Sequence, residues 1–341
     1  MRALLRIVVV AVSLVLGLLA VEYVLLRGAL GYHGIVDAQV VAYDEELGWK
    51  LQPNIDVPSS QLEFGLRVRT DAMGLRTSGH TDTWRSIPRR VLVAGDSFAF
   101  GWGVEGDQMF SARLQDALAA NNVQAAVLNA GVPGFSTDQE YLLWRRLEAQ
   151  VRPEVVVLLI SGNDPPSDNT SSVPMNGAIY SKPFFRITSS GLELRGVPVP
   201  DKQPAFEPSS LEPFKARLRP LAAYALGRQF NTRLHAPPSR ENAPAIAAPS
   251  DSLTMTRSIL AAFSRDLRAG GGTLLVALIP SPSLRDGLAR ICGAEGIAFL
   301  DLGPAFEGRP DLTFKYDGHW NARGHQAAAN AVVTTLMRML K

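Results

Sequence analysis

Cysteine is nearly missing from this sequence, in which Cys292 is the one thiol among 341 residues. A single cysteine excludes a disulfide within the chain and a metal site built from several thiolates. The histidine and cysteine spacings typical of zinc sites are missing as well. We therefore expect a chemistry that needs neither a bound metal nor a cofactor.

An excess of charge of one sign is also missing. The chain carries 34 basic and 32 acidic residues, a formal net charge of +2, and neither kind forms a long run. Nucleic acid is therefore not an expected partner. With 46% hydrophobic and 19% charged residues, the chain has the composition of a folded protein with one large or two modest domains.

One long hydrophobic run lies at the amino terminus. Residues 7–21 contain no charged side chain, two arginines precede them, and the apolar character continues past Glu22 to Leu26. About twenty such residues span a bilayer, and basic residues before the span hold the amino end in the cytoplasm. We expect residues 1–31 to form a transmembrane signal anchor, with the rest of the chain on the periplasmic or extracytoplasmic side. A cleaved signal peptide is the alternative, although no clear cleavage site follows the run.

The remainder of the chain divides by pattern. Residues 32–89 hold short polar segments with glycines and prolines, which predict a lead-in of brief strands and turns. From residue 90 onward, apolar runs alternate with amphipathic stretches, and this alternation predicts an α/β fold. The expected strands are 90–95, 123–131, 154–162, 272–280 and 297–303, and the expected helices are 107–122, 137–150, 251–269, 283–294 and 321 to the end.

The strand at 154–162 is an almost continuous apolar run, which is typical of a parallel sheet covered on both faces. We therefore predict a doubly wound, flavodoxin-like parallel sheet with helices on both faces in a domain at 90–341. An insertion rich in proline and serine, at about 165–250, interrupts the alternation. Part of it is expected to be loop, and a lid and a partner surface are both open as its role.

Polar or glycine-rich residues follow the expected strands where each apolar run stops. Asp96 and Ser97 follow the first strand, "NAGVPGFST" the second, "SGND" the third, and "YDGHW" comes after the last. In a doubly wound sheet, ligands bind in the crevice beyond the carboxyl ends of the strands. Ser97 is therefore expected to be displayed in a crevice that all these segments share.

A serine hydroxyl becomes a good nucleophile only when a base removes its proton, and histidine is the side chain suited to that near neutral pH. His319 has Asp317 two residues before it. In an extended segment these two side chains point to the same side, so the carboxylate can orient the imidazole. His325 is expected inside the first turn of the last helix, where no acid is so placed.

Acyl transfer also needs hydrogen-bond donors at the oxygen that gains negative charge. The sequence offers three candidates: the backbone N–H of Ser97, the backbone N–H of Gly134, and the side-chain amide of Asn163. Glycine at 134 would allow the backbone to approach a substrate closely. A turn glycine and a helix cap remain the alternative interpretations of Gly134 and Asn163.

These residues together resemble the SGNH, or GDSL-type, hydrolases. "GDS" at 95–97, the glycine of "NAGVPG", "GND" at 162–164 and "DGH" at 317–319 match the four blocks of that family in order. The resemblance implies an SGNH-type fold with a catalytic triad of Ser97, His319 and Asp317, and an oxyanion hole formed by Ser97, Gly134 and Asn163.

One feature departs from the usual family pattern. A single residue, Gly318, separates Asp317 from His319, where two residues are usual. This spacing, like the segments "LGWKLQPN" and "DAMGLR", resembles the branch found in membrane-anchored envelope proteins and in O-acetyltransferases of exopolysaccharides such as alginate. The shorter spacing makes the orientation of Asp317 a point for the structure to decide.

Two rival motifs fail on context. "GWGVEG" at 101–106 fits the spacing of a dinucleotide-binding turn, but it begins some six residues after the first strand ends, and no acidic residue closes the second strand. The nucleophile elbow of α/β-hydrolases needs glycine at position 99, where this chain has Ala99.

The expected function is serine-dependent acyl-ester transfer on an O-acylated carbohydrate of the cell envelope or an exopolysaccharide. Water as acceptor makes the protein an esterase or deacetylase, and a glycan hydroxyl makes it an O-acetyltransferase. The expected partners are this substrate, the membrane through the amino-terminal helix, and other proteins of an envelope polysaccharide pathway. A catalytically silent SGNH domain that binds glycan or acts as a scaffold is the alternative, and the complete set of five site residues argues against it.

Overall fold

The computed structural model describes residues 2–36, 39–78, 83–175, 178–200, 211–235 and 250–340. A parallel sheet of five strands, in the order β13-β12-β7-β5-β6, forms its centre. This order confirms the doubly wound prediction, because the chain adds β6 on one side of β5 and then β7 on the other. The strands lie inside the expected ranges: β5 Arg90–Ala94, β6 Ala126–Asn129, β7 Val155–Ile160, β12 Thr273–Leu278 and β13 Ala298–Asp301.

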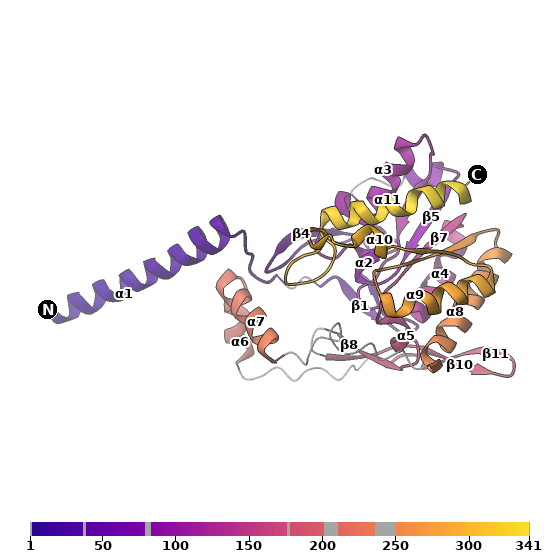
Figure 1. Ribbon diagram of the computed structural model, residues 1–341. Coiled ribbons are helices and arrows are strands. Elements are labelled where there is room, and N and C mark those ends of the chain that lie inside the picture. Colours follow the sequence, from indigo (N-terminus) through magenta and orange to yellow (C-terminus); the bar gives the residue numbers. More distant parts are fainter. Residues whose placement is uncertain are drawn as a thin grey trace.

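Helices cover both faces of this sheet (Figure 1). Helices α3 (Phe110–Ala120) and α11 (Ala322–Met339) lie on one face, and α4 (Thr137–Val151), α8 (Ser250–Ala269) and α9 (Pro282–Glu295) on the other. Every residue of β7 is buried, because its alternate side chains enter the two helical layers. The apolar run at 154–162 therefore forms a strand that is covered on both faces, as its composition predicts.

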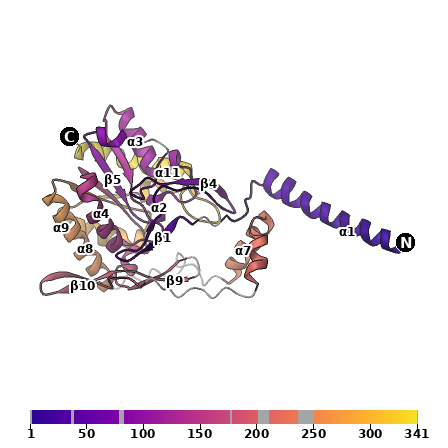
Figure 2. The same ribbon diagram turned by 180° about the vertical axis from the view of Figure 1, so that it is seen from behind.

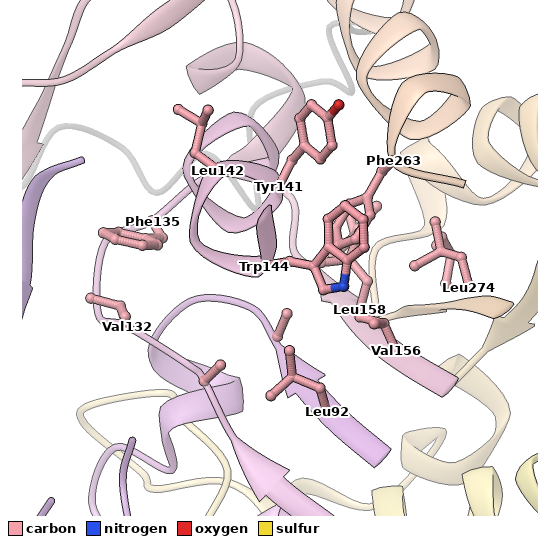
Figure 3. Close-up of a cluster of buried hydrophobic side chains, with 14 of the residues drawn as sticks. Leu92, Val132, Phe135, Tyr141, Leu142, Trp144, Val156, Leu158, Phe263 and Leu274 are labelled. Atoms are coloured by element: carbon pink, nitrogen blue, oxygen red, sulfur yellow. The ribbon is translucent and has the colours of Figure 1, made fainter. Parts of the chain in front are cut away.

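Aromatic side chains join α4 and α8 above the sheet. The rings of Trp144 and Phe263 have centroids 5.0 Å apart, and Tyr141 lies 5.3 Å from Phe263 (Figure 3). Below them, Leu92 and Val156 come from neighbouring strands. Full burial of one such aromatic side chain stabilises the fold by about 3 kcal/mol, so this cluster fixes α4 on the sheet.

The lead-in forms two antiparallel hairpins, β1 (Val41–Asp44) with β2 (Gly48–Leu51) and β3 (Asp56–Gln61) with β4 (Phe64–Arg69). Their buried residues belong to the same hydrophobic cluster as one face of the sheet. Short helical turns occur elsewhere: η2 Thr83–Ser86, η3 Gly106–Gln108, α10 Gly303–Phe306 and η4 Pro310–Leu312. The lead-in is thus packed against the main domain.

The region expected as an insertion at 165–250 is described except for residues 176–177, 201–210 and 236–249. It contains two hairpins and two helices, which the sequence pattern did not predict. The hairpins are β8 (Ser172–Met175) with β9 (Ala178–Ser181) and β10 (Phe184–Thr188) with β11 (Gly191–Arg195), and the helices are α6 (Glu212–Leu218) and α7 (Ala222–His235).

The amino terminus is a long apolar helix, α1 (Arg2–Ala20), continued by the π-helical turn η1 (Val21–Ala29). It projects from the rest of the protein in both views (Figures 1 and 2). Residues 2–29 are long and apolar enough to cross a membrane, and no part of the most apolar stretch is buried in the protein. A membrane anchor and a signal sequence both have these properties.

Candidate active site

Ser97 lies where the central strand β5 turns into a helix. The chain passes Gly95, whose φ of +148° and crowded surroundings admit no larger side chain, because a Cβ there would lie 2.7 Å from the Cβ of Ala99. Ser97 then begins the short helix α2 (Ser97–Phe100), and the carboxylate of Asp96 accepts the N–H of Phe98 at 2.9 Å. The turn therefore holds Ser97 at the carboxyl edge of the sheet.

The structure brings together Ser97 and His319, which are 222 residues apart in the chain. The Oγ of Ser97 lies 2.8 Å from Nε2 of His319, and Nδ1 of His319 lies 2.5 Å from Oδ1 of Asp317. Three side chains thus form one continuous series of hydrogen bonds.

The protonation of this series follows from Asp317. Burial raises the pKa of Asp317, but its hydrogen bonds with His319 and Trp102 and the charge of His319 outweigh burial and hold the pKa below its ordinary value. An ionised carboxylate only accepts, so Nδ1 of His319 carries the hydrogen. Nε2 then presents its lone pair to the Ser97 hydroxyl, as a general base must.

The expected reason for the Asp317–His319 pairing was wrong, because the segment is not extended. Residues 315–317 form a turn, and Gly318 has a φ of +88°, in the region that favours glycine. The turn folds the carboxylate back, so that Oδ1 of Asp317 also accepts the backbone N–H of His319 at 3.3 Å. A single glycine between acid and base is therefore enough to orient both.

Aromatic rings surround the imidazole. The ring of Phe98 lies 4.7 Å from the ring of His319, and that of Trp102 lies 6.3 Å away, between centroids. The indole N–H of Trp102 also donates to Oδ2 of Asp317 at 3.3 Å. Trp102 thus holds the second carboxylate oxygen, although no sequence pattern marked it as a site residue.

A residue of the lead-in holds the loop that carries Asp317. The carboxylate of Glu63 accepts three consecutive backbone N–H groups, those of Lys315 at 2.9 Å, Tyr316 at 2.6 Å and Asp317 at 2.8 Å. Glu63 lies between β3 and β4, more than 250 residues from this loop. Only the folded chain reveals this contact, since nothing in the sequence around Glu63 signals it.

The other two expected oxyanion donors follow the strands on either side of β5. Gly134 lies in the turn after β6 and has a φ of +80°. Asn163 follows β7 and is the N-terminal cap residue of α5 (Asp164–Ser167). Because the carboxyl ends of neighbouring parallel strands share one edge, all three donors lie on the side of the sheet where Ser97 is displayed. The amide oxygen of Asn163 accepts the Ser161 hydroxyl at 2.5 Å, and the residue is exposed.

Buried carboxyl groups lie beneath this edge. The Ser161 Oγ is 2.9 Å from Asp96, 3.2 Å from Asp164 and 2.5 Å from the Asn163 oxygen, yet a hydroxyl has one hydrogen to donate. Burial raises the pKa of both Asp96 and Asp164. Both carboxyl groups therefore retain a proton to a higher pH than an exposed aspartate does.

Another buried carboxyl group belongs to α4. Glu140 lies in the first turn of this helix, which begins after Ser136, and its carboxyl is buried with no hydrogen-bond partner in the described part of the chain. Burial, followed by repulsion from nearby carboxylates such as Asp164, raises its pKa well above the ordinary value. The neighbouring Asp138, in contrast, has a partner: Lys182 donates to its carboxylate in an ion pair that is fully buried.

His325 takes the position expected for it, inside the first turn of α11 after the cap Asn321. Its Nδ1 accepts the N–H of Phe110 at 3.2 Å, and burial lowers its pKa to about 3. It is therefore a neutral core histidine. Within the described residues, no group of three histidine, cysteine, aspartate or glutamate side chains is placed to hold a metal ion.

A cavity of about 170 Å³ adjoins Asp317 between the β3–β4 hairpin and α7. Polar groups line much of it, among them Glu63, Arg228 and Gln229. Gln229 also donates to the backbone carbonyl of Tyr316 at 3.1 Å, which ties α7 to the loop of Asp317. Polar groups thus line a cavity that reaches the acid of the hydrogen-bonded series.

The fold and these contacts define a doubly wound α/β protein with a serine, a histidine and an aspartate in hydrogen-bonding order at the carboxyl edge of its sheet. Residues 93–248 match the model of the GDSL-like Lipase/Acylhydrolase family. This segment of the chain therefore matches a GDSL-like lipase and acylhydrolase domain, as the resemblance predicted. None of the curated proteins matches the chain.

Solved structures of similar fold include several esterases. TesA is 18% identical, and the match covers 74% of this chain and 99% of that one with a TM-score of 0.41. The family 3 carbohydrate esterase of Clostridium thermocellum is 14% identical, with 74% and 99% covered and a TM-score of 0.42. The psychrotrophic esterase EstA of Pseudoalteromonas sp. is 12% identical, with 74% and 98% covered and a TM-score of 0.42.

Proposed function

We propose that this protein transfers acyl groups from esters by a catalytic triad of Ser97, His319 and Asp317. The observation that carries the proposal is the series of hydrogen bonds from Ser97 Oγ through the imidazole to the Asp317 carboxylate, 2.8 Å and 2.5 Å long. A serine with an oriented base is the arrangement that nucleophilic acyl transfer requires.

The reaction proceeds in two steps. Nε2 of His319 takes the hydroxyl proton as Ser97 Oγ attacks the ester carbonyl carbon, and the N–H groups of Ser97, Gly134 and Asn163 stabilise the oxyanion. The ester bond breaks, and the imidazolium returns the proton to the leaving alcohol. An acceptor hydroxyl then loses its proton to His319 and attacks the acyl-enzyme. The bond between the acyl group and Ser97 Oγ breaks, and the imidazolium returns the proton to Oγ, which yields an acid from water or a new ester from an alcohol.

The proposed substrate is an O-acylated polysaccharide of the cell envelope or an exopolysaccharide, reached from the extracytoplasmic side of a membrane. Support comes from the apolar helix at residues 2–29 and from the Asp-Gly-His spacing, which resembles the membrane-anchored branch of the superfamily. Both esterase and O-acetyltransferase activities fit this chemistry.

Hydrolysis of a chromogenic acetyl ester by the full chain in detergent tests the triad. We expect turnover in the native protein and its loss in Ser97→Ala, with Ser111→Ala as the matched serine control on α3. Equal rates for the native protein and Ser97→Ala would remove Ser97 from the mechanism. No turnover with any ester, together with unchanged glycan binding in Ser97→Ala, would favour a silent binding domain instead.

Addition of an oligosaccharide acceptor distinguishes the two activities. A transferase produces acetylated sugar, detected by mass spectrometry, at the expense of free acetate. An esterase releases acetate at the same rate with or without the acceptor. Either outcome requires Ser97, so the variant serves as the control in both arms.

A further inference from the structure

Helix α7 packs against the protein with one of its faces. Ala225 is buried in a small cluster with Ile35 and Leu62, and Gln229 donates to the carbonyl of Tyr316. Ala222, one turn before Ala225, is also fully buried. These positions recur every three or four residues, so they form a single face of the helix.

The opposite face of α7 is apolar and exposed. Phe230 is 56% exposed and Leu234 is 80% exposed, and Ala223 and Gly227 continue the same stripe. A Cβ added at Gly227 would meet no atom within 4 Å, so the described residues leave this stripe open. A surface helix of a soluble protein normally presents polar residues on such a face.

Helix α6 adds to this surface. Phe214 is 60% exposed, and Leu211, just before the helix, is also 60% exposed. Among the described residues, the two exposed phenylalanines are both in these two helices. The α6–α7 hairpin, residues 211–235, therefore exposes large apolar side chains on both of its helices.

This hairpin is attached to the end of the apolar amino-terminal helix. The carboxylate of Glu22 accepts the N–H groups of Ala222 at 2.7 Å and Ala223 at 2.9 Å, which begin α7. Arg27 donates to Glu22 at 2.8 Å and also to the carbonyl of Pro220. Both views show α7 beside the inner end of this helix (Figures 1 and 2). If residues 2–29 span a bilayer, these bonds hold the start of α7 at the bilayer surface.

The α6–α7 hairpin has a net positive charge, which suits a position at the bilayer surface. Residues 211–235 contain five basic residues and one acidic residue, whereas the whole chain is nearly neutral. Helices that combine exposed aromatic and aliphatic side chains with basic residues bind in the headgroup region of membranes, where lipid phosphates attract the cations.

We propose that the α6–α7 hairpin is a lipid-binding surface that lies in the headgroup region of the same bilayer that the amino-terminal helix spans. The proposal rests on the membrane anchor and not on the acyl-transfer chemistry. Because Gln229 of α7 also donates to the carbonyl of Tyr316, the loop of Asp317 then lies on the same side of the protein as the membrane-binding hairpin.

Fluorescent labels test this arrangement in the full chain, reconstituted into vesicles of phosphatidylcholine and phosphatidylglycerol. Cysteine replaces Phe214 or Phe230 and carries an environment-sensitive fluorophore, while the native Cys292 is fully buried and does not compete. Leu14→Cys in α1 is the control for a label inside the bilayer. Ile187→Cys, at an exposed apolar position on β10, is the control for a label that stays in water. Circular dichroism and thermal melting verify that each variant is folded.

We expect nitroxide-labelled lipids to quench the fluorescence at positions 14, 214 and 230 and to leave position 187 unchanged. The proposal is overturned if positions 214 and 230 respond as position 187 does while position 14 is quenched. It is equally overturned if position 14 is not quenched, because α7 is attached to that helix. A label at 230 that is shielded from aqueous iodide yet insensitive to lipid nitroxide would indicate a protein partner or a second copy instead.

Discussion

Glu63→Gln isolates the contribution of the lead-in to the proposed catalysis. The carboxylate of Glu63 accepts three backbone N–H groups of the loop that ends at Asp317. Glutamine keeps the size of the side chain, but its NH₂ group replaces one acceptor oxygen and faces a donor. One charge-assisted hydrogen bond is then lost, and the other two become neutral and weaker.

The magnitude follows from these bonds. A hydrogen bond to a charged group contributes about 1.5–3 kcal/mol and a neutral one about 0.5–1.5 kcal/mol, so the change removes roughly 3.5–6 kcal/mol in a fully buried site. Glu63 is half-buried, and solvent reduces this to about 2 kcal/mol. If these hydrogen bonds are what keeps the loop of Asp317 ordered, their loss lowers the fraction of enzyme molecules in which Asp317 is correctly placed. A loss of about 2 kcal/mol then decreases kcat about 30-fold.

Steady-state kinetics on a soluble acetyl ester, with thermal melting alongside, measure this effect. We expect kcat to fall while KM stays constant, because Glu63 acts on the orientation of Asp317 and not on the bound ester. Glu307→Gln, an exposed glutamate after α10, is the matched control and should behave as the native protein. A kcat within about twofold of the native value, or a loss explained by the melting temperature alone, would refute the positioning role of Glu63.

Three further changes test the site and the buried carboxyl groups. Asp317→Asn should lower kcat by about 10³–10⁴-fold, because the amide no longer holds the imidazole in the useful tautomer, and a smaller loss in ester turnover would argue against the triad. Gly318→Ala forces a side chain into a φ of +88°, which strains the turn by about 1–2 kcal/mol. Its kcat should fall while the melting temperature changes little, and native kinetics would contradict this account of the turn. Glu140 keeps its proton in the folded state above its ordinary pKa, so folding loses about 1.4 kcal/mol for each pH unit above that value while the proton stays bound. Urea unfolding of Glu140→Gln should therefore show a stability, relative to the native protein, that rises as the pH increases above the ordinary pKa of a glutamate. A constant difference would refute the buried proton.

Local pattern predicted the elements of the sheet well. The strand β7 consists of six apolar residues because both of its faces are covered, and that composition is visible without coordinates. Strand ends also located Ser97, Gly134 and Asn163, because an apolar run that stops at a polar or glycine-rich turn marks the edge of a sheet. The hairpins and helices of the insertion escaped prediction, because their short periodic segments are separated by proline and serine.

The same limit applies to individual side chains. Asp317 and His319 pair as their spacing of two residues predicts, but through a turn with a positive φ at Gly318 and not through an extended segment. Glu140 lies in the first turn of a helix that the sequence predicts, but only the packing of α4 shows that its carboxyl is buried. In both cases the residue type was visible in the sequence, whereas its surroundings depended on the packing of other segments.

The amino-acid order by itself determined the strands, the helices and the residues that end each strand, because these depend on the local spacing of apolar, polar and glycine residues. Tertiary structure alone decided which distant segments meet. Ser97 reaches His319 across 222 residues, Glu63 closes on the loop of Asp317, and Glu22 binds the start of α7. Such contacts depend on how whole elements pack against one another, and no local pattern of side chains encodes the distance between them.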